Sequence, residues 1–216
     1  MILTAHQQKL LTLLSKEQDL CSTFLLSGGT ALAAFHLFHR LSDDLDFFSM
    51  EKVDELRVHR FIDDVSGSIG VQSNDHRRVF DRSIFQLTLA DESLLKLEFT
   101  HYPYASLDAP VSVDGVRIDS LRDIAANKLA ALLDRFEPKD YYDLYFILRQ
   151  QGRTLHALRA DTEKKFGFVI NPVVLGAACA RVERLPILPH LLEPIPPQDI
   201  VSFFLSLARS LKDEVV

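Results

Sequence analysis

The sequence predicts an α+β fold, in which a mixed α/β core is followed by a helical lobe. Residues 23–48 read as strand, helix and strand, and extended segments recur between residues 77 and 100. Beyond residue 120 the apolar positions recur with helical spacing instead. We therefore expect a core over residues 1–119 and a lobe over residues 120–216, either as two domains or as one continuous globular unit.

Caps and periodicity predict the individual elements of the core. Thr4 is a suitable N-cap, and the leucines between residues 10 and 14 form a helical stripe. Residues 95–99 alternate strictly between apolar and charged, which is the period of a strand with one buried face. The expected helices are 4–20, 30–38 and 53–65, and the expected strands are 23–26, 44–48, 77–80, 83–89 and 94–100, with a further small hairpin at 113–116.

The lobe is expected to be entirely helical. Asn171-Pro172 is typical of a helix start, and the proline-rich residues 185–197 are the only linker-like stretch in the sequence. The expected helices are 121–134, 139–150, 154–165, 172–182 and 198–212.

The composition excludes several classes of protein. Hydrophobic residues make up 47% of the 216 residues, which is enough for a full core. The formal net charge of −6 argues against nucleic-acid binding by bulk charge, so a polynucleotide would have to be gripped locally. Cys21 and Cys179 match no zinc spacing and are too few for a secreted disulfide scaffold, so we interpret both as core residues. With no long apolar run either, the sequence predicts a cytoplasmic protein without membrane contacts.

The most informative segment lies between residues 27 and 46. Ser27-Gly28-Gly29-Thr30 follows an apolar strand and precedes a helix, so backbone N–H groups of the glycine turn can face a phosphate. Asp44-Leu45-Asp46 then begins the next strand, where residues two apart share a face and lie roughly 6.6 Å apart along the strand. Two carboxylates on one face favour a divalent cation. Each motif alone also fits an ordinary turn or a solvated strand end, but the combination favours a nucleotide site.

A second group of charged residues lies in the lobe. Lys128 and Arg135 are seven residues apart and therefore project from one face of a helix, where they could meet a polyphosphate. Asp140 and Asp143 are neighbours at i and i+3 on the next helix. The alternative is a salt-bridge network between the two helices, and the sequence leaves both interpretations open.

Together these motifs resemble those of the AbiEii/AbiGii nucleotidyltransferase toxins, which belong to the DNA polymerase β-like superfamily. The resemblance covers residues 23–148 and is carried by four motifs in order: Gly28-Gly29-Thr30, Arg40-x-Ser42-x-Asp44-Leu45-Asp46-Phe47-Phe48, Lys128-Leu129-x-Ala131-x-x-x-Arg135 and Lys139-Asp140-x-x-Asp143-Leu144. It implies a polymerase β-like nucleotidyltransferase core with a mixed sheet.

The resemblance also implies site residues. Asp44 and Asp46 would hold Mg²⁺ or Mn²⁺, and Lys128 and Asp140 would join them as catalytic residues. The implied nucleotide-binding residues are Ser27, Gly28, Gly29, Thr30, Arg40, Lys128 and Arg135. Glu98 is the best candidate for a third carboxylate, acting as a metal ligand and catalytic residue, because it lies on a later strand and on its charged face. We expect the two halves to contribute to one pocket.

The implied reaction is metal-dependent transfer of NMP from an NTP to a hydroxyl acceptor. By resemblance the acceptor is RNA such as tRNA, and a cognate antitoxin is a further partner. The alternatives are a phosphotransferase or kinase that uses the same pocket, and a non-catalytic nucleotide-binding interaction protein.

Other polar residues are less informative. His36 and His39 have no matching third metal ligand nearby in the sequence, so we interpret them as packing or surface residues. Two basic groups are interpreted as scattered surface charges rather than an RNA-binding patch: Arg77, Arg78 and Arg82, and Lys164 and Lys165.

Overall fold

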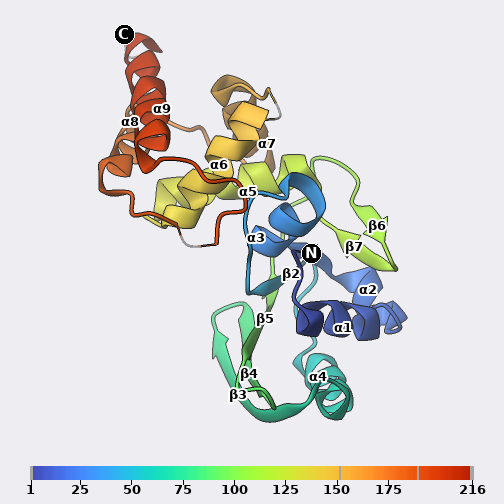
Figure 1. The fold of residues 1–216 in the computed structure, drawn as a ribbon. Helices are drawn as coiled ribbons and strands as arrows, with labels where there is room; N and C mark the ends of the chain where they lie inside the picture. The colour runs from blue at the N-terminus through green and yellow to red at the C-terminus, as the bar shows by residue number, and fades with distance from the viewer. Residues whose placement is uncertain (1, 151, 189, 215–216) are drawn as a thin grey trace. The chain divides into compact units, whose positions relative to one another are not determined.

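The structure is a computed structural model that describes residues 2–150, 152–188 and 190–214 (Figure 1). It divides into two compact units, Met1–Ser120 and Leu121–Val216. The first unit holds a mixed sheet and the second is helical, so the expected fold class is confirmed. Whether the two units are separate domains stays a prediction.

Seven strands form one sheet in the order β3-β4-β5-β2-β1-β7-β6. The strands are β1 (Leu25–Ser27), β2 (Leu45–Ser49), β3 (Val71–Val79), β4 (Arg82–Leu89), β5 (Leu94–His101), β6 (Val111–Val113) and β7 (Val116–Ile118). Strands β2 and β5 run parallel, as do β1 and β7, and the other neighbours are antiparallel. Strand β3 begins six residues earlier than the sequence predicts, because residues 72–76 are all polar and show no alternation.

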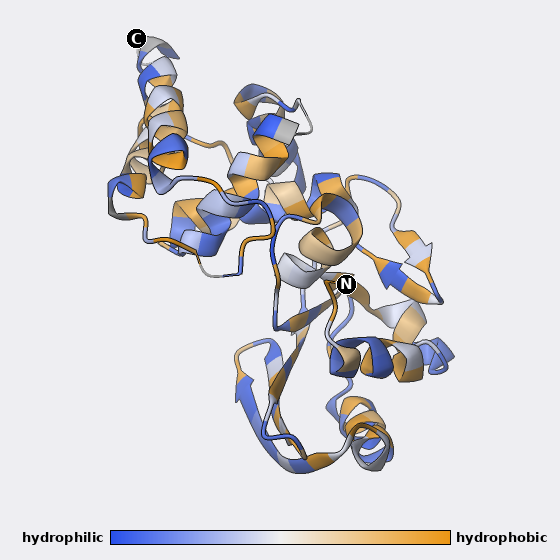
Figure 2. Cartoon of the chain, viewed as in Figure 1, coloured by the Kyte–Doolittle hydropathy of each residue, from blue (hydrophilic) through white to orange (hydrophobic). Residues whose placement is uncertain are grey.

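The two faces of the central strands differ in polarity, as the alternation predicts. Leu45, Phe47, Leu97 and Phe99 are buried on one face, and the rings of Phe47 and Phe99 stack with centroids 4.9 Å apart. The intervening residues of β2 and β5 project from the opposite face. Figure 2 shows hydrophobic and hydrophilic residues alternating along β5. The apolar face builds the core, which leaves the polar face for the candidate site.

The helices of the first unit are α1 (Ala5–Leu14), α2 (Gln18–Thr23), α3 (Gly28–Ala31) and α4 (Glu55–Ile69), with a π-helix, η1 (Leu32–Leu37), directly after α3. Thr4 and Gln7 form a capping box at the start of α1, which confirms Thr4 as the N-cap. The single helix expected over 4–20 is wrong, because the chain leaves helical geometry at Glu17 with φ −89° and ψ 80°. The helix after the glycine turn ends at Phe38, which has a left-handed φ of 56°.

The second unit contains helices whose bounds lie close to those expected. They are α5 (Leu121–Asp134), α6 (Pro138–Gln150), α7 (Leu155–Phe166), α8 (Pro172–Ala180) and α9 (Pro197–Ser210), with 3-10 turns η2 (Arg181–Arg184) and η3 (Leu211–Glu214). Tyr141, Tyr142, Phe146 and Phe204 are buried in its core. Cys179 is buried as expected, whereas Cys21 is only half-buried. Within the described residues, none of the helices has the length and apolarity needed to cross a membrane.

Candidate active site

Four polar residues lie in one row across the centre of the sheet: Ser27, Asp46, Glu98 and Asp119. Because three of the four are acidic, we call this group the acidic row. Strand pairing places Ser27 opposite Asp46, and Asp46 opposite Glu98. Asp119 follows β7 beside Ser27, whose hydroxyl donates to Asp119 Oδ2 at 2.7 Å. The row therefore brings together three of the residues predicted from the sequence and adds a fourth.

Asp119 is the member of this row that the sequence analysis missed. Its side chain is buried and also accepts a hydrogen bond from the Ser120 backbone N–H at 3.0 Å, while His36 contacts its carbonyl oxygen at 2.9 Å. An acidic residue directly after the short strand 116–118 was the available signal. Recognising it requires knowing that this strand pairs with β1, which is information about tertiary structure.

The glycine turn at Gly28-Gly29 packs directly against strand β2, which carries Asp46. Gly28 has a φ of +69°, and a Cβ on it would lie 2.9 Å from Asp46 Cγ. A Cβ on Gly29 would lie 2.6 Å from Arg40 Nη2. Thr30 Oγ1 donates to the backbone oxygen of Asp44. The positive φ and the close approach favour glycine at position 28, and they make the backbone of the turn and the Asp46 carboxylate neighbours.

A lysine lies between two of the predicted carboxylates. Lys96 Nζ is 3.1 Å from Asp44 Oδ2 and 3.8 Å from Glu98 Oε2. The side chain of Asp44 is 37% exposed, so its carboxylate can be approached from solvent. Lys96 is thus a site residue that the sequence analysis treated only as part of an alternating strand.

Glu98 is held by the neighbouring strand. Arg82 Nε and Nη2 donate to the two carboxylate oxygens of Glu98, each at 2.6 Å, and Thr100 Oγ1 donates to Oε1 at 3.1 Å. Burial alone would raise the pKa of Glu98, but the hydrogen bonds and charge of Arg82 lower the pKa below its ordinary value. Glu98 is therefore an ionised partner of Arg82, and both of its carboxylate oxygens accept hydrogen bonds from Arg82.

The carboxylates of Asp44 and Asp46 are suitable ligands for a magnesium ion that also binds phosphate oxygens. In the described part of the chain, no cluster of three or more His, Cys, Asp or Glu side chains is arranged to hold a metal. Mg²⁺ is commonly held by one or two carboxylates together with phosphate oxygens, which suits Asp44 and Asp46 on one side of β2. The role of Glu98 as a third ligand stays a prediction.

The charged residues of the second unit form a network between α5 and α6. Lys128 Nζ lies 2.9 Å from Asp140 Oδ1 and 2.7 Å from Asp143 Oδ2, and both carboxylates are fully buried. Arg135 Nε lies 3.2 Å from Asp140 Oδ2. The interhelical salt bridges weighed for this segment are thus present, and the charge of Lys128 is matched by carboxylates. The proposed contacts of Lys128 and Arg135 with nucleotide stay predictions.

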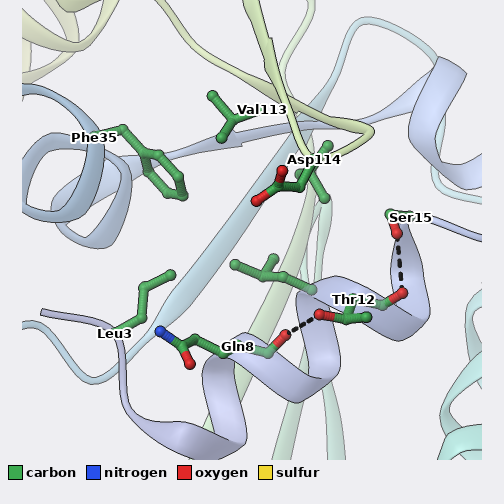
Figure 3. Close-up of a pocket in the computed structure, with 9 residues that line it drawn as sticks. Leu3, Gln8, Thr12, Ser15, Phe35, Val113 and Asp114 are labelled. Carbon is green, nitrogen blue, oxygen red and sulfur yellow. Dashed lines mark hydrogen bonds between the residues drawn. The ribbon is translucent and has the colours of Figure 1, made fainter. Parts of the chain in front are cut away.

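A separate cavity of about 420 Å³ lies in the first unit (Figure 3). Its lining includes Leu3 and Gln8 near the N-terminus, Phe35 of η1, and Val113 and Asp114 of the β6–β7 hairpin. None of the predicted nucleotide- or metal-binding residues lines it. The cavity is therefore distinct from the acidic row.

The sheet and its acidic row define the class of protein, a nucleotidyltransferase fold. A candidate nucleotidyltransferase from H. pylori superposes with a TM-score of 0.63 at 19% identity, over 98% of this chain and 97% of that chain. JHP933 from Helicobacter pylori gives a TM-score of 0.59 at 20% identity, over 97% and 91%. MenT4, a nucleotidyltransferase toxin from Mycobacterium tuberculosis, gives 0.51 at 14% identity, over 97% and 86%. At these identities the likeness establishes the fold.

The sequence match is more specific. Residues 12–214 match the family described as nucleotidyl transferase AbiEii toxin, type IV toxin–antitoxin system, and the chain belongs to this family. An uncharacterized protein from Aquifex aeolicus, aq_aa25, is 33% identical over 151 residues, which are 68% of each chain. The resemblance stated from the motifs is confirmed, and the protein is a nucleotidyltransferase.

Proposed function

We propose that this protein transfers NMP from an NTP to a hydroxyl of an RNA acceptor such as tRNA, with Mg²⁺ or Mn²⁺ bound by Asp44 and Asp46. One observation carries the proposal: the Gly28 turn lies against the Asp46 carboxylate, with no room for a side chain between them. Phosphates at the backbone of the turn and a cation at the carboxylates would therefore be neighbours. Family membership supports a role as the toxin of a toxin–antitoxin pair, so a cognate antitoxin is a proposed partner.

In the proposed reaction the acceptor oxygen attacks the α-phosphorus of the NTP. The new P–O bond forms as the bond to the β-phosphate oxygen breaks, pyrophosphate leaves, and the hydroxyl proton passes to solvent. The glycine turn orients the triphosphate, and Thr30 holds the turn to the backbone of Asp44. The metal, when bound, neutralises charge on the phosphates. Lys128 is the proposed phosphate-binding lysine, and buried Asp140 and Asp143 fix its position.

Product analysis with two labels tests the reaction type. The full-length protein is incubated with Mg²⁺, total bacterial RNA and each NTP in turn, labelled at either the α- or the γ-phosphate. Nucleotidyl transfer moves only the α-label to RNA and releases labelled pyrophosphate from the γ-labelled NTP. A kinase would instead move the γ-label and leave nucleoside diphosphate, which would refute the proposal.

Variants then connect the reaction to the site. Asp44→Ala is expected to abolish label transfer, because Asp44 is one of the two proposed metal ligands and its side chain is 37% exposed. Expression of Asp46→Asn in bacteria tests the toxin role. If that variant still inhibited growth while transferring no label, the inhibition would come from binding a partner instead of catalysis.

A further inference from the structure

The hairpin of β3 and β4 ends in an exposed aromatic residue. Val79 pairs with Arg82, so Phe80 and Asp81 alone form the turn. Phe80 is 91% exposed, the highest value among the large hydrophobic residues of the described chain. Burial therefore does not explain a phenyl ring at this position.

The backbone makes the presence of phenylalanine more unusual. Phe80 has a φ of +53°, in the left-handed region that glycine and asparagine adopt most easily. A bulky residue in this conformation is strained, and such strain is concentrated at functional sites. An exposed ring that neither packs nor suits its turn indicates that the ring contacts something outside the chain.

The turn is also locally basic. Residues 77–82 carry three arginines and one aspartate, a net charge of +2 in a chain of net charge −6. The side chains of Arg77 and Arg78 are 63% and 64% exposed, and their carboxylate contacts are at 3.5 Å to Asp75 and 3.0 Å to Glu55. Such exposed pairs contribute little stability and can exchange for a phosphate. The sequence analysis interpreted these arginines as scattered surface charges. In the structure they share one hairpin end with Phe80.

The hairpin end is connected to the acidic row. Arg82 donates to Glu98, which pairs with Asp46 on the neighbouring strand. Arg82 lies two strands across and two residues along from Asp46, so their Cα atoms are roughly 12 Å apart. A polynucleotide only a few nucleotides long could contact both places.

We propose that this hairpin end, Arg77 to Arg82, binds a single-stranded segment of the RNA acceptor next to its reacting hydroxyl. A base stacks on Phe80, and Arg77 and Arg78 contact phosphates. The segment is single-stranded because only an unpaired base can stack on a side chain in this way. The residues of β3 are mostly hydrophilic, as the colouring in Figure 2 shows, which favours a polynucleotide over a protein partner, whose interface would include an apolar centre. This inference rests on the RNA acceptor of the proposed function.

Direct binding tests the inference without requiring catalysis. Fluorescence anisotropy measures the affinity of the full-length protein for a labelled single-stranded RNA of mixed sequence and for its duplex, in EDTA and without NTP. Phe80→Ala is expected to weaken single-strand binding at least about fivefold, and Phe80→Tyr to keep it. Phe168→Ala, which removes another exposed ring between α7 and α8, is the matched control and should bind as wild type.

Two further variants separate binding from folding and charge. Phe80→Gly should raise the melting temperature, because glycine relieves the positive φ, while it weakens RNA binding. Arg77→Gln should lower the salt dependence of binding by about one unit of slope, and Lys9→Gln on α1 should not.

The outcomes distinguish this inference from the proposed function. Equal affinities of wild type and Phe80→Ala, or a preference of wild type for duplex, would overturn the inference and leave the hairpin available to a protein partner. Label transfer to RNA that Phe80→Ala leaves unchanged would do the same while the proposed function stands. Conversely, Phe80-dependent binding without any label transfer would keep the hairpin contact and reject the reaction.

Discussion

At the scale of single residues, Gly28 is the glycine at which an added side chain would meet the closest neighbouring atom. Alanine there would be strained at a φ of +69°, and its Cβ would overlap the Asp46 carboxylate. We expect Gly28→Ala to lower the free energy of unfolding by about 1–3 kcal/mol and to abolish NMP transfer. Urea unfolding and the label-transfer assay measure the two effects.

Gly67 provides the matched control for this substitution. It lies within α4, and a Cβ built on it meets nothing within 4 Å. Gly67→Ala should therefore stabilise the protein by about 0.5–1 kcal/mol, because alanine is the better helix former. If Gly28→Ala behaved like Gly67→Ala, the close approach of the turn to Asp46 would be refuted.

The proposed metal ligand Asp46 can be compared with the nearby Asp43, which is not a proposed ligand. Asp46→Asn keeps the shape of the side chain but removes the charge that would hold the metal, so transfer should fall by at least about 100-fold with little change in melting temperature. Asp43→Asn should leave the rate near that of wild type, because Asp43 is an exposed residue that precedes the pair and is not a proposed ligand. An equal loss in both variants would mean that the ligand assignment is wrong.

At the scale of elements, charged side chains connect the helices of the second unit. Asp161 on α7 accepts from Arg122 on α5 and, at 3.2 Å, from Arg153. The buried Lys165 on the same helix lies 2.8 Å from Asp123 of α5. Since Arg122 and Asp123 both lie on α5, their ion pairs with Asp161 and Lys165 help to set how α7 packs on α5.

Asp161 predicts a pH dependence of stability. The hydrogen bond from Arg122 is the largest cause that lowers the pKa of Asp161 below its ordinary value. A carboxylate with a lowered folded-state pKa adds stability that is fully present above its unfolded pKa of about 3.9 and is lost as pH falls through the folded pKa. Asp161→Asn should therefore cost about 1–3 kcal/mol at pH 7 and less at pH 3.

Urea unfolding of wild type and Asp161→Asn at pH 7, 5 and 3 measures this effect. Asp64→Asn on the exposed face of α4 is the control, and should change the free energy of unfolding by less than about 0.5 kcal/mol at each pH. A constant difference between wild type and Asp161→Asn from pH 7 to pH 3 would show that the Asp161 charge contributes nothing to stability.

At the scale of the whole molecule, ligand binding should raise the melting temperature. A ligand that binds only the folded protein at 100 times its Kd stabilises it by about 2.7 kcal/mol, which for a chain of this length corresponds to roughly 5–10 °C. We expect such a rise with Mg²⁺ and a non-hydrolysable NTP together. The rise should disappear with EDTA or in Asp46→Asn, and a rise that survives both would place the nucleotide elsewhere.

Local patterns were sufficient for most of the fold. Helix α5 has the bounds expected from the sequence, and β4 and β5 differ from their expected bounds by one residue at a single end. These elements have regular apolar periodicity and clear ends, which are properties of neighbouring residues. The break at Glu17 and the π-helix η1 were not predicted, because no glycine or proline marks either one.

The sequence by itself determined the fold class, the family, and the glycine turn and acidic pair, because these depend on short motifs and on periodicity along the chain. Only the tertiary structure placed Asp119 beside Ser27, engaged Glu98 with Arg82, and exposed Phe80 in a two-residue turn between paired strands. The reason is physical: strand register sets which side chains meet across a sheet, and register depends on the pairing of segments far apart in the sequence.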